Sequence, residues 1–309
     1  MGESGVYAGL HILELGAGAA GPLATRYFAE QGATVIRVES SVRPDFLRFL
    51  HAQPDEPAGL DAAPVFALLN PDKWSVSIDL RKPAGVDLVL RLADWADVVS
   101  QSLEPAAMEE LGLGPAQLLS RKPALIVVTN SLFGQTGRQR RDPGFGRQGS
   151  AIAGFDHLTG WPDREPVGPY ATITDSLSSR YGALLIAAAL LVRSRGGGGQ
   201  HIDVAQVETG VYSLSEMVVR RSANGESIAR AGNREPGAAP HGVYPCAGED
   251  AWIAIAVTDD EEWRALVAAM GAPGWAREPR FATAAGREAN QDDLDAHLAA
   301  WTRESGAYL

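Results

Sequence analysis

The sequence predicts an α/β fold with a Rossmann-like parallel sheet in a large domain and a smaller α+β second domain. Short apolar runs alternate with helical segments through about residue 130, as in doubly wound sheets. A glycine-rich turn, residues 16–21, separates the first apolar run from the first helical segment. After residue 242 the pattern changes to two short strands around a Gly-Glu-Asp turn. We therefore place the large domain at 1–224 and the small domain at 225–309.

The elements follow from hydrophobic spacing and from Gly and Pro. A strand at 10–15, a helix at 22–31 and a strand at 33–39 make an opening βαβ unit. Residues 133–168 are rich in Gly, Pro, Arg and Asp and predict loops. Further strands are predicted at 76–80, 97–100, 124–130, 201–204, 243–246 and 252–257. Further helices are predicted at 84–95, 105–111, 175–194, 206–221, 261–270 and 292–301.

Composition excludes several classes of protein. The 309 residues are 45% apolar and 21% charged, which is the balance of a globular protein and excludes wholesale disorder. The single Cys246 can close neither a disulfide nor a thiolate zinc site. A net charge of −11 disfavours general binding to nucleic acid. We expect no metal and no nucleic-acid partner.

The chain also carries no predicted membrane or secretion segment. The N-terminus lacks a basic region followed by an apolar one. The longest apolar run, residues 181–192, is too short to cross about 30 Å of hydrocarbon and predicts a buried helix. We therefore expect a cytoplasmic protein without a membrane partner.

The glycine-rich turn has three interpretations. Its spacing, Gly16-x-Gly18-x-x-Gly21 between a strand and a helix, matches the turn that cradles a dinucleotide pyrophosphate. Glu39 closes the second strand, where an acidic residue would hold a ribose hydroxyl. The same run suits a methyltransferase that binds S-adenosylmethionine. Small residues that only pack a Rossmann-like turn would give the same pattern, so the turn alone decides nothing.

Two further features are equally open. Arg138, Arg140, Arg141 and Arg147 lie in one predicted loop, where they either neutralise phosphates or face solvent. Asp175 begins a long apolar helix. It is either a helix cap, whose carboxylate accepts free backbone N–H groups, or a functional carboxylate.

Longer motifs along the chain carry a more specific signal. They are Leu13-Glu-Leu15 with Ala20-Gly-Pro22, Gly32 to Glu39, Asn70-Pro-Asp-Lys73-Trp-Ser75 with Asp79-Leu80, Phe133-Gly-Gln-Thr-Gly137, Asp175-Ser176 through Asp203-Val204, Gly232-Asn233-Arg234, and Gly242-x-Tyr244-Pro-Cys246. In these motifs the chain resembles the class III coenzyme A transferases, the family of formyl-CoA transferase and carnitine CoA-transferase. That family also includes alpha-methylacyl-CoA racemases. The likeness runs through nearly the whole chain.

The resemblance implies that the Rossmann-like domain binds coenzyme A in place of NAD. It implies an enzyme that moves coenzyme A between an acyl-CoA thioester and a carboxylic acid. Asp175 falls at the family's nucleophile, which passes through an aspartyl mixed anhydride and an aspartyl-CoA thioester. Lys73 falls at a position of the family that contacts coenzyme A, and Arg48 lies in a segment like one that flanks that pocket. With Ala19 of the glycine-rich turn and with Arg138 and Arg147 of the arginine-rich loop, these are the residues that we expect to bind coenzyme A. The resemblance also implies a homodimer. Dimers of the family interlock because each chain forms a ring that its C-terminal segment closes, and without that segment the ring would stay open.

Departures from the family's pattern keep alternatives open. The racemases carry a catalytic His in a Gly-His-Asp run, and this chain has Gly144-Phe145-Gly146 there, which favours a transferase. Family members are longer, and their C-terminal segment returns to the large domain, so we expect that segment to be absent here or supplied by a partner chain. The alternatives are a racemase-like enzyme, a non-catalytic coenzyme A-binding subunit, or a fragment of a longer transferase.

Overall fold

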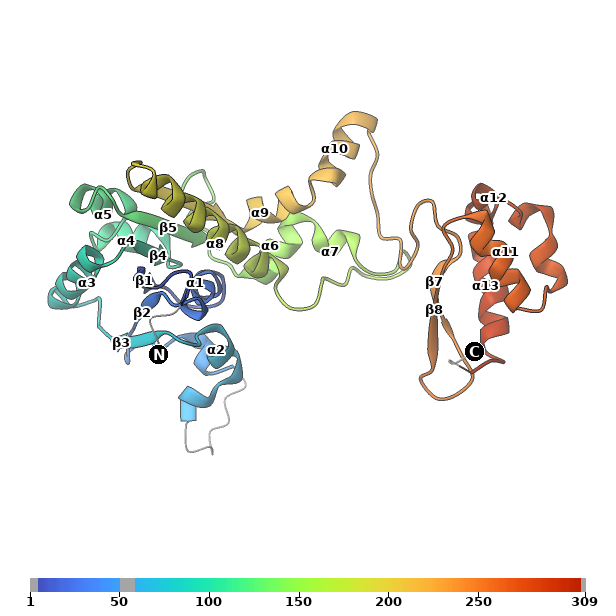
Figure 1. The fold of residues 1–309 in the computed structure, drawn as a ribbon, viewed down its shortest axis with the longest axis horizontal. Helices are drawn as coiled ribbons and strands as arrows, with labels where there is room; N and C mark the ends of the chain where they lie inside the picture. Colours follow the sequence, from blue (N-terminus) through green and yellow to red (C-terminus); the bar gives the residue numbers. More distant parts are fainter. Residues whose placement is uncertain (1–4, 51–58, 307–309) are drawn as a thin grey trace. The chain divides into compact units, whose positions relative to one another are not determined.

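The structure is a computed structural model that describes residues 5–50 and 59–306. The chain divides into two compact units (Figure 1). The large unit comprises Met1–His157 and Gly168–Ile228, and the small unit comprises Leu158–Val167 and Ala229–Leu309. The small unit thus includes a short excursion from the middle of the chain, which follows the large unit's α7 (Phe155–Leu158).

The large unit is built on a six-stranded sheet in the order β3-β2-β1-β4-β5-β6. Its strands are β1 (His11–Leu15), β2 (Thr34–Glu39), β3 (Trp74–Ser77), β4 (Val98–Gln101), β5 (Ile126–Ser131) and β6 (Gln200–Ala205). All neighbouring strands are parallel, with Leu13 opposite Ile36 on β2 and opposite Val99 on β4. The predicted Rossmann-like parallel sheet is confirmed. The third strand starts two residues earlier than predicted, because its register with β2 pairs Trp74 with Ile36.

Helices cover both faces of the sheet, because successive strand residues point to opposite sides. Ile12 and Val98 join a core with α1 (Ala20–Glu30) and α8 (Ile173–Ser194). Their neighbours Leu13 and Val99 join a second core on the opposite face. That core is closed by α3 (Pro83–Trp95), α4 (Pro105–Glu110) and α5 (Pro115–Arg121).

The strand order reverses between β1 and β4, which is the place where open α/β sheets bind ligands. The glycine-rich turn follows β1 at this carboxyl edge. A Cβ atom on Gly16 would lie 2.2 Å from Ser102 Oγ, in the residue after β4, so only glycine fits this close approach. The turn therefore lies at the carboxyl edge of the sheet, where the strand order reverses.

The segment predicted as loops, residues 133–168, contains two helices. They are α6 (Gly146–Ala153) and α7. The loop prediction was wrong because Gly146 and Gly149 lower intrinsic helix propensity, whereas in the fold they let α6 approach α8 closely. The helix predicted at 206–221 is also divided at Leu214 into α9 (Gln206–Ser213) and α10 (Ser215–Asn224).

The structure describes the excursion between β2 and β3 except for residues 51–58. It contains η1 (Phe46–Arg48), η2 (Gly59–Ala62) and α2 (Pro64–Leu69). Leu47, Phe66 and Leu69 form a small apolar cluster against which Ala19 of the glycine-rich turn packs. The excursion is thus attached to the carboxyl edge of β1.

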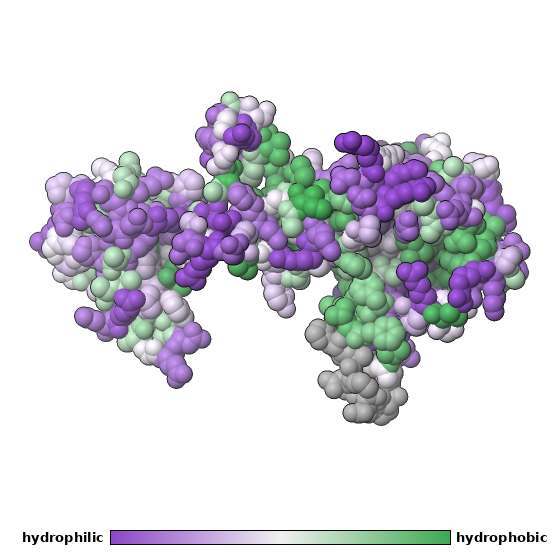
Figure 2. Space-filling view, turned by 180° about the vertical axis from the view of Figure 1, so that it is seen from behind, coloured by the Kyte–Doolittle hydropathy of each residue, from purple (hydrophilic) through white to green (hydrophobic). Residues whose placement is uncertain are grey.

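By length and composition, α8 could cross a membrane, since it has 22 residues and a mean hydropathy of 1.3 over its best window. However, Ile186 and Ala189 are buried in the core beside the sheet. The outer side of α8, together with α9 and α10, exposes further apolar residues. They are Leu184, Leu185, Leu191, Val192, Val211, Tyr212, Val218 and Val219. Figure 2 shows apolar surface of this kind in green among the polar regions.

The small unit is an α+β unit, as predicted. Its two strands, β7 (His241–Pro245) and β8 (Trp252–Ala256), are antiparallel. Its helices are α11 (Asp260–Ala269), η3 (Gly274–Arg277), η4 (Pro279–Phe281), α12 (Ala284–Ala289) and α13 (Gln291–Thr302). Trp263, Phe281 and Leu294 lie at the centre of its core. The fully buried Arg287 hydrogen-bonds the carbonyls of Ala239, Phe281 and Asp259.

Candidate active site

Asp175 lies in the first turn of α8 and is only 9% exposed. The helix begins at Ile173, two residues earlier than predicted, and Thr172 occupies the N-cap position. The interpretation of Asp175 as the helix cap is therefore wrong. The sequence suggested it because Asp175 is the first charged residue before the apolar run, whereas the helix extends back over Ile173 and Thr174.

Gly146, the first residue of α6, lies directly against the Asp175 carboxylate. A Cβ atom built on Gly146 would be 2.2 Å from Oδ2 and 2.5 Å from Cγ of Asp175. The Gly146 carbonyl is fixed by two hydroxyls, Thr174 Oγ1 at 2.7 Å and Ser150 Oγ at 2.9 Å. The absence of a side chain at position 146 thus makes room for the carboxylate, and the two hydroxyls hold the glycine in place.

The polar side chains of Thr172 and Gln206 influence the pKa of the Asp175 carboxyl. Burial raises the pKa of Asp175, whereas hydrogen bonds from Thr172 and Gln206 act in the opposite direction. The net direction is upward. The helix N-terminus by itself favours the ionised form of a carboxyl, but burial of Asp175 outweighs that effect.

Two aromatic rings border the same region. Phe145, the neighbour of Gly146, makes an edge-to-face contact with Phe46 of η1, with ring centroids 5.3 Å apart. A Cβ atom on Gly18 would lie 3.3 Å from the Phe46 ring. Ser179, one turn after Asp175, donates a 2.8 Å hydrogen bond to the Ala20 carbonyl. The glycine-rich turn, η1, α6 and α8 therefore meet around Asp175.

Behind the glycine-rich turn lies a buried ionic network. Glu14 of β1 accepts from Arg37 of β2, and Arg37 also donates to Asp45. Asp45 accepts the backbone N–H of Gly18 at 3.1 Å and that of Leu47 at 2.9 Å. Burial alone raises the pKa of Glu14, but Lys73 and Arg37 outweigh it and hold that pKa below its usual range.

Lys73 belongs to this network. Its Nζ donates to Glu14 Oε2 at 2.8 Å, to the Pro22 carbonyl at 2.8 Å and to Asn70 Oδ1 at 3.0 Å. All three ammonium donors are therefore engaged within the chain. Lys73 ties β1 and the first turn of α1 to the segment before β3.

Arg48 is also paired. It donates to Glu39 through Nε at 2.9 Å and Nη2 at 2.8 Å, and to Asp61 through Nη1 at 2.5 Å. Its guanidinium lies 3.6 Å from the centre of the Phe66 ring. Glu39, expected at a ribose hydroxyl if the turn bound a dinucleotide, is thus engaged by Arg48 and lies close to Arg37.

The remaining predicted residues are spread over the edge of the large unit. Ala19 is the N-cap of α1 within the glycine-rich turn. Arg138 is exposed in the loop after β5. Arg147 on α6 pairs with Asp156 at 3.0 Å. Of these two arginines, Arg147 follows directly on Gly146, the residue that lies against Asp175.

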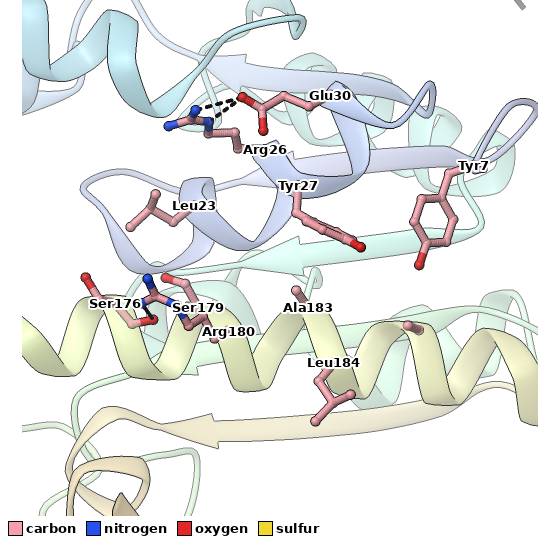
Figure 3. Close-up of a pocket in the computed structure, with 11 residues that line it drawn as sticks. Tyr7, Leu23, Arg26, Tyr27, Glu30, Ser176, Ser179, Arg180, Ala183 and Leu184 are labelled. Carbon is pink, nitrogen blue, oxygen red and sulfur yellow. Dashed lines mark hydrogen bonds and ion pairs between the residues drawn. The ribbon is translucent and has the colours of Figure 1, made fainter. Parts of the chain in front are cut away.

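A separate groove of about 460 Å³ lies between α1 and α8 (Figure 3). Leu23 and Tyr27 of α1 face Ala183 and Leu184 of α8, and Arg180 lies near one end. Asp175 is not among the lining residues. Within residues 5–50 and 59–306, no group of three His, Cys, Asp or Glu side chains is placed to hold a metal ion.

Comparison with known proteins identifies the family to which this chain belongs. The profile of CoA-transferase family III matches residues 7–307. The chain belongs to CoA-transferase family III. Its members are enzymes that use coenzyme A thioesters, which replaces the dinucleotide and S-adenosylmethionine interpretations of the turn.

Relatives with curated names are consistent with membership of this family. The chain is 39% identical to succinyl-CoA–D-citramalate CoA-transferase of Chloroflexus aurantiacus, over 95% of this chain and 72% of that protein. It is 34% identical to a probable CoA-transferase, Rv1866, of Mycobacterium tuberculosis, over 96% of this chain and 37% of that protein. A solved CAIB/BAIF family protein from Brucella suis superposes with a TM-score of 0.88 at 31% identity, over 97% of this chain and 79% of that one.

The sequence did not draw attention to several residues of this CoA-transferase site. Gln206 and Thr172 were not singled out, and Gly146 was noted only as a departure from the racemase pattern. Gln206 directly follows β6, so it lies at the carboxyl edge of a parallel strand. That position is the signal that would have identified it.

Proposed function

We propose that the chain moves coenzyme A between an acyl-CoA and a carboxylic acid, with Asp175 as the covalent nucleophile. The observation that carries the proposal is the buried Asp175 carboxylate, which faces a glycine at the carboxyl edge of the sheet. A carboxylate that is taken out of water and left without a cationic partner is poorly placed to stabilise a fold. It is well placed to react with an electrophile.

The chemistry consists of four exchanges. An Asp175 oxygen attacks the thioester carbon, so that a C–O bond forms, the C–S bond breaks and coenzyme A leaves as a thiolate. The thiolate attacks Cγ of the anhydride, which forms an aspartyl thioester and releases the donor carboxylate. An incoming carboxylate repeats the first exchange at the aspartyl thioester. The thiolate then attacks the new acyl carbonyl and regenerates the Asp175 carboxylate.

The geometry suits both directions of this exchange. The position of Asp175 in the first turn of α8 places it among backbone N–H groups that lack helical partners. Such groups can stabilise negative charge on the carbonyl oxygen in each tetrahedral intermediate. The raised pKa of Asp175 also fits a reactive carboxylate, because an anion that is less well solvated is a stronger nucleophile.

We further propose that coenzyme A lies along the carboxyl edge of the large unit, in contact with Ala19, Arg48, Lys73, Arg138 and Arg147. Because Lys73 and Arg48 are already paired, a phosphate would have to share or replace their present partners. Exposed Arg138 meets no such competition. We also propose a cytoplasmic homodimer, since exposed apolar residues on α8 to α10 are typical of a protein contact.

A racemase is less well supported by the geometry. Inversion at a carbon beside the thioester needs a base on one side and an acid on the other. Gly146, which lies against the Asp175 carboxylate, and its neighbour Phe145 carry no titratable group. The transferase reaction needs only the carboxylate and stabilisation of an oxyanion.

The proposal is tested by covalent trapping. With acetyl-CoA or succinyl-CoA, donors named in relatives of this chain, hydroxylamine should convert the acylated enzyme to a hydroxamate at residue 175. Mass spectrometry of the digested protein locates the adduct. Asp175→Asn should fold, lose turnover and form no adduct. Asp259→Asn, at the genuine cap of α11, is the matched control and should react like the wild type. An active Asp175→Asn enzyme would end the proposal.

A further inference from the structure

Arg147 holds together three segments of the large unit. It follows Gly146 on α6, the residue against which the Asp175 carboxylate lies. Its guanidinium pairs with Asp156 of α7, with Nη1 3.2 Å from Oδ1 and Nη2 3.0 Å from Oδ2. The same guanidinium lies against Gly168, where a Cβ atom would be 1.7 Å from Nη1 and 2.5 Å from Cζ. One side chain thus contacts α6, α7 and the segment that leads into α8.

A single guanidinium can reach both Asp156 and Gly168 because the chain between them folds back on itself. Val167 N–H donates to the Thr159 carbonyl at 3.4 Å, and the Thr159 hydroxyl donates to the Val167 carbonyl. Asp156 lies just before this closed loop, and Gly168 lies just after it. The guanidinium is planar and rigid, so it can pair with a carboxylate and lie flat on a glycine at the same time.

The segment between Gly168 and α8 depends on contacts of this kind. Tyr170 is fully exposed, so its ring does not fix the chain. Ala171 has a φ of 60°, in the left-handed region that is unfavourable for a residue with a side chain. Such a conformation persists only where the surrounding structure imposes it. The contact of Arg147 with Gly168, shortly before Ala171, is one such constraint.

The place where α8 begins decides how Asp175 meets Gly146. Thr174 Oγ1 donates to the Gly146 carbonyl at 2.7 Å, so the first turns of α6 and α8 touch directly. A Cβ atom on Gly146 would be 2.2 Å from Asp175 Oδ2, so the two residues are already in close contact. Displacements of about 1 Å at a reacting group cost about 100-fold in rate. A shift of the segment before α8 would therefore act on the carboxylate.

We propose that Arg147 is a positioning residue for Asp175, which fixes the start of α8 on α6 by holding Asp156 and Gly168 together. The inference rests on Asp175 being the nucleophile. The Arg147–Asp156 pair is partly exposed, so it contributes little to the stability of the fold. It contributes geometry, since two parallel hydrogen bonds set the plane of the guanidinium. This role does not require Arg147 to contact coenzyme A.

The test measures single-turnover acylation of Asp175 by succinyl-CoA, the donor named in a relative of this chain. Arg147→Lys keeps the charge and loses the planar fork, Asp156→Asn removes the carboxylate, and Gly168→Ala places a methyl group where the guanidinium lies. Each should lower the maximal rate by about tenfold or more and leave the half-saturating concentration of succinyl-CoA unchanged. The melting temperature should fall by about 4 °C or less.

Arg121→Lys is the matched control in the large unit. Arg121 of α5 makes a similar pair with Asp94 of α3, through Nε at 2.6 Å and Nη2 at 2.5 Å. This variant should acylate like the wild type. If Arg147 served only as a phosphate contact, Arg147→Lys would keep most of the maximal rate and Asp156→Asn would lose none, and that pattern would overturn the positioning role. A merely structural role would lower melting temperatures without changing the maximal rate.

A measurement that needs no acyl donor separates the two proposals. Amide hydrogen exchange across residues 155–172 should be faster in the three variants than in the wild type, and unchanged in Arg121→Lys. Unchanged exchange together with wild-type acylation would overturn the role of Arg147 and leave Asp175 in place. Faster exchange in a protein whose wild type forms no adduct would instead overturn the nucleophile and, with it, the positioning role.

Discussion

Replacing Gly146 by alanine adds one methyl group against the Asp175 carboxylate. The new Cβ atom would lie 2.2 Å from Oδ2, whereas ordinary contacts begin at about 3.4 Å. The carboxylate must therefore retreat by the difference, about 1.2 Å, or α6 must shift by a similar distance. Displacements of about 1 Å at a reacting group cost about 100-fold in rate. We expect kcat to fall by about that factor.

The stability cost should be small by comparison. Overpacking costs about 1–3 kcal/mol, and alanine is favoured over glycine in a helix by up to about 1 kcal/mol. Gly146 is helical and needs no left-handed backbone conformation, so the substitution brings no backbone strain. The net loss of unfolding free energy should thus be about 0–2 kcal/mol. The variant should fold and yet be nearly inactive.

Gly149→Ala is the matched control on the same helix. Its Cβ atom would lie 2.6 Å from Thr174 Oγ1 and 3.0 Å from Leu132 Cδ1, so it overpacks α6 and displaces the hydroxyl that holds the Gly146 carbonyl, without touching the carboxylate itself. It therefore measures what the loss of that support costs when the carboxylate keeps its space. Thermal melting and steady-state transfer of coenzyme A should be measured for both variants. Similar melting temperatures with a much larger rate loss in Gly146→Ala are expected. Wild-type kcat in folded Gly146→Ala would refute the argument.

Three other outcomes are expected. Asp175→Asn should raise the melting temperature at neutral pH, because the raised pKa of Asp175 means that ionisation of this carboxyl destabilises the folded state. The gain should shrink as the pH falls through the raised pKa of the folded state and should be absent below the ordinary value of 3.8. Lys73→Met should lower the free energy of unfolding by about 3–5 kcal/mol in denaturant titrations, since Glu14 keeps its buried charge. A coenzyme A affinity unchanged in folded Lys73→Met would remove Lys73 from the coenzyme site. Arg287→Met should lower the midpoint followed by Trp263 fluorescence, because buried carbonyls lose their donor at about 1–3 kcal/mol each.

The parallel sheet could be predicted because its strands are short apolar runs separated by clear turn residues. The runs at β1, β2 and β5 are mostly buried in the sheet. Such runs predict strands from their own residues, even when the strands that pair with them are not known. Helix α6 could not be predicted in this way. Its glycines disfavour a helix locally, and the helix exists because α8 packs against the space they leave.

The candidate site was predictable only where a motif marked it. Asp175 stands at a recognisable position in a family motif, whereas Gln206 is one polar residue after a strand. The network around Glu14 shows a second obstacle. Its ammonium partner, Lys73, is 59 residues away, and nothing in the local run around either residue signals the pairing. Long-range charge pairs become visible only when the fold brings their strands together.

The carboxylate of Asp45 has a consequence for phosphate binding. In dinucleotide enzymes, the backbone N–H groups of such a turn receive a phosphate. Here the Gly18 N–H already points at an internal anion, and Arg37 neutralises that anion from behind. Any phosphate, that of coenzyme A included, would have to displace Asp45 before it could reach this N–H group. The turn therefore uses its anion-binding N–H group to hold the excursion that carries Asp45, and the phosphates of a nucleotide must be bound by other groups of the carboxyl edge.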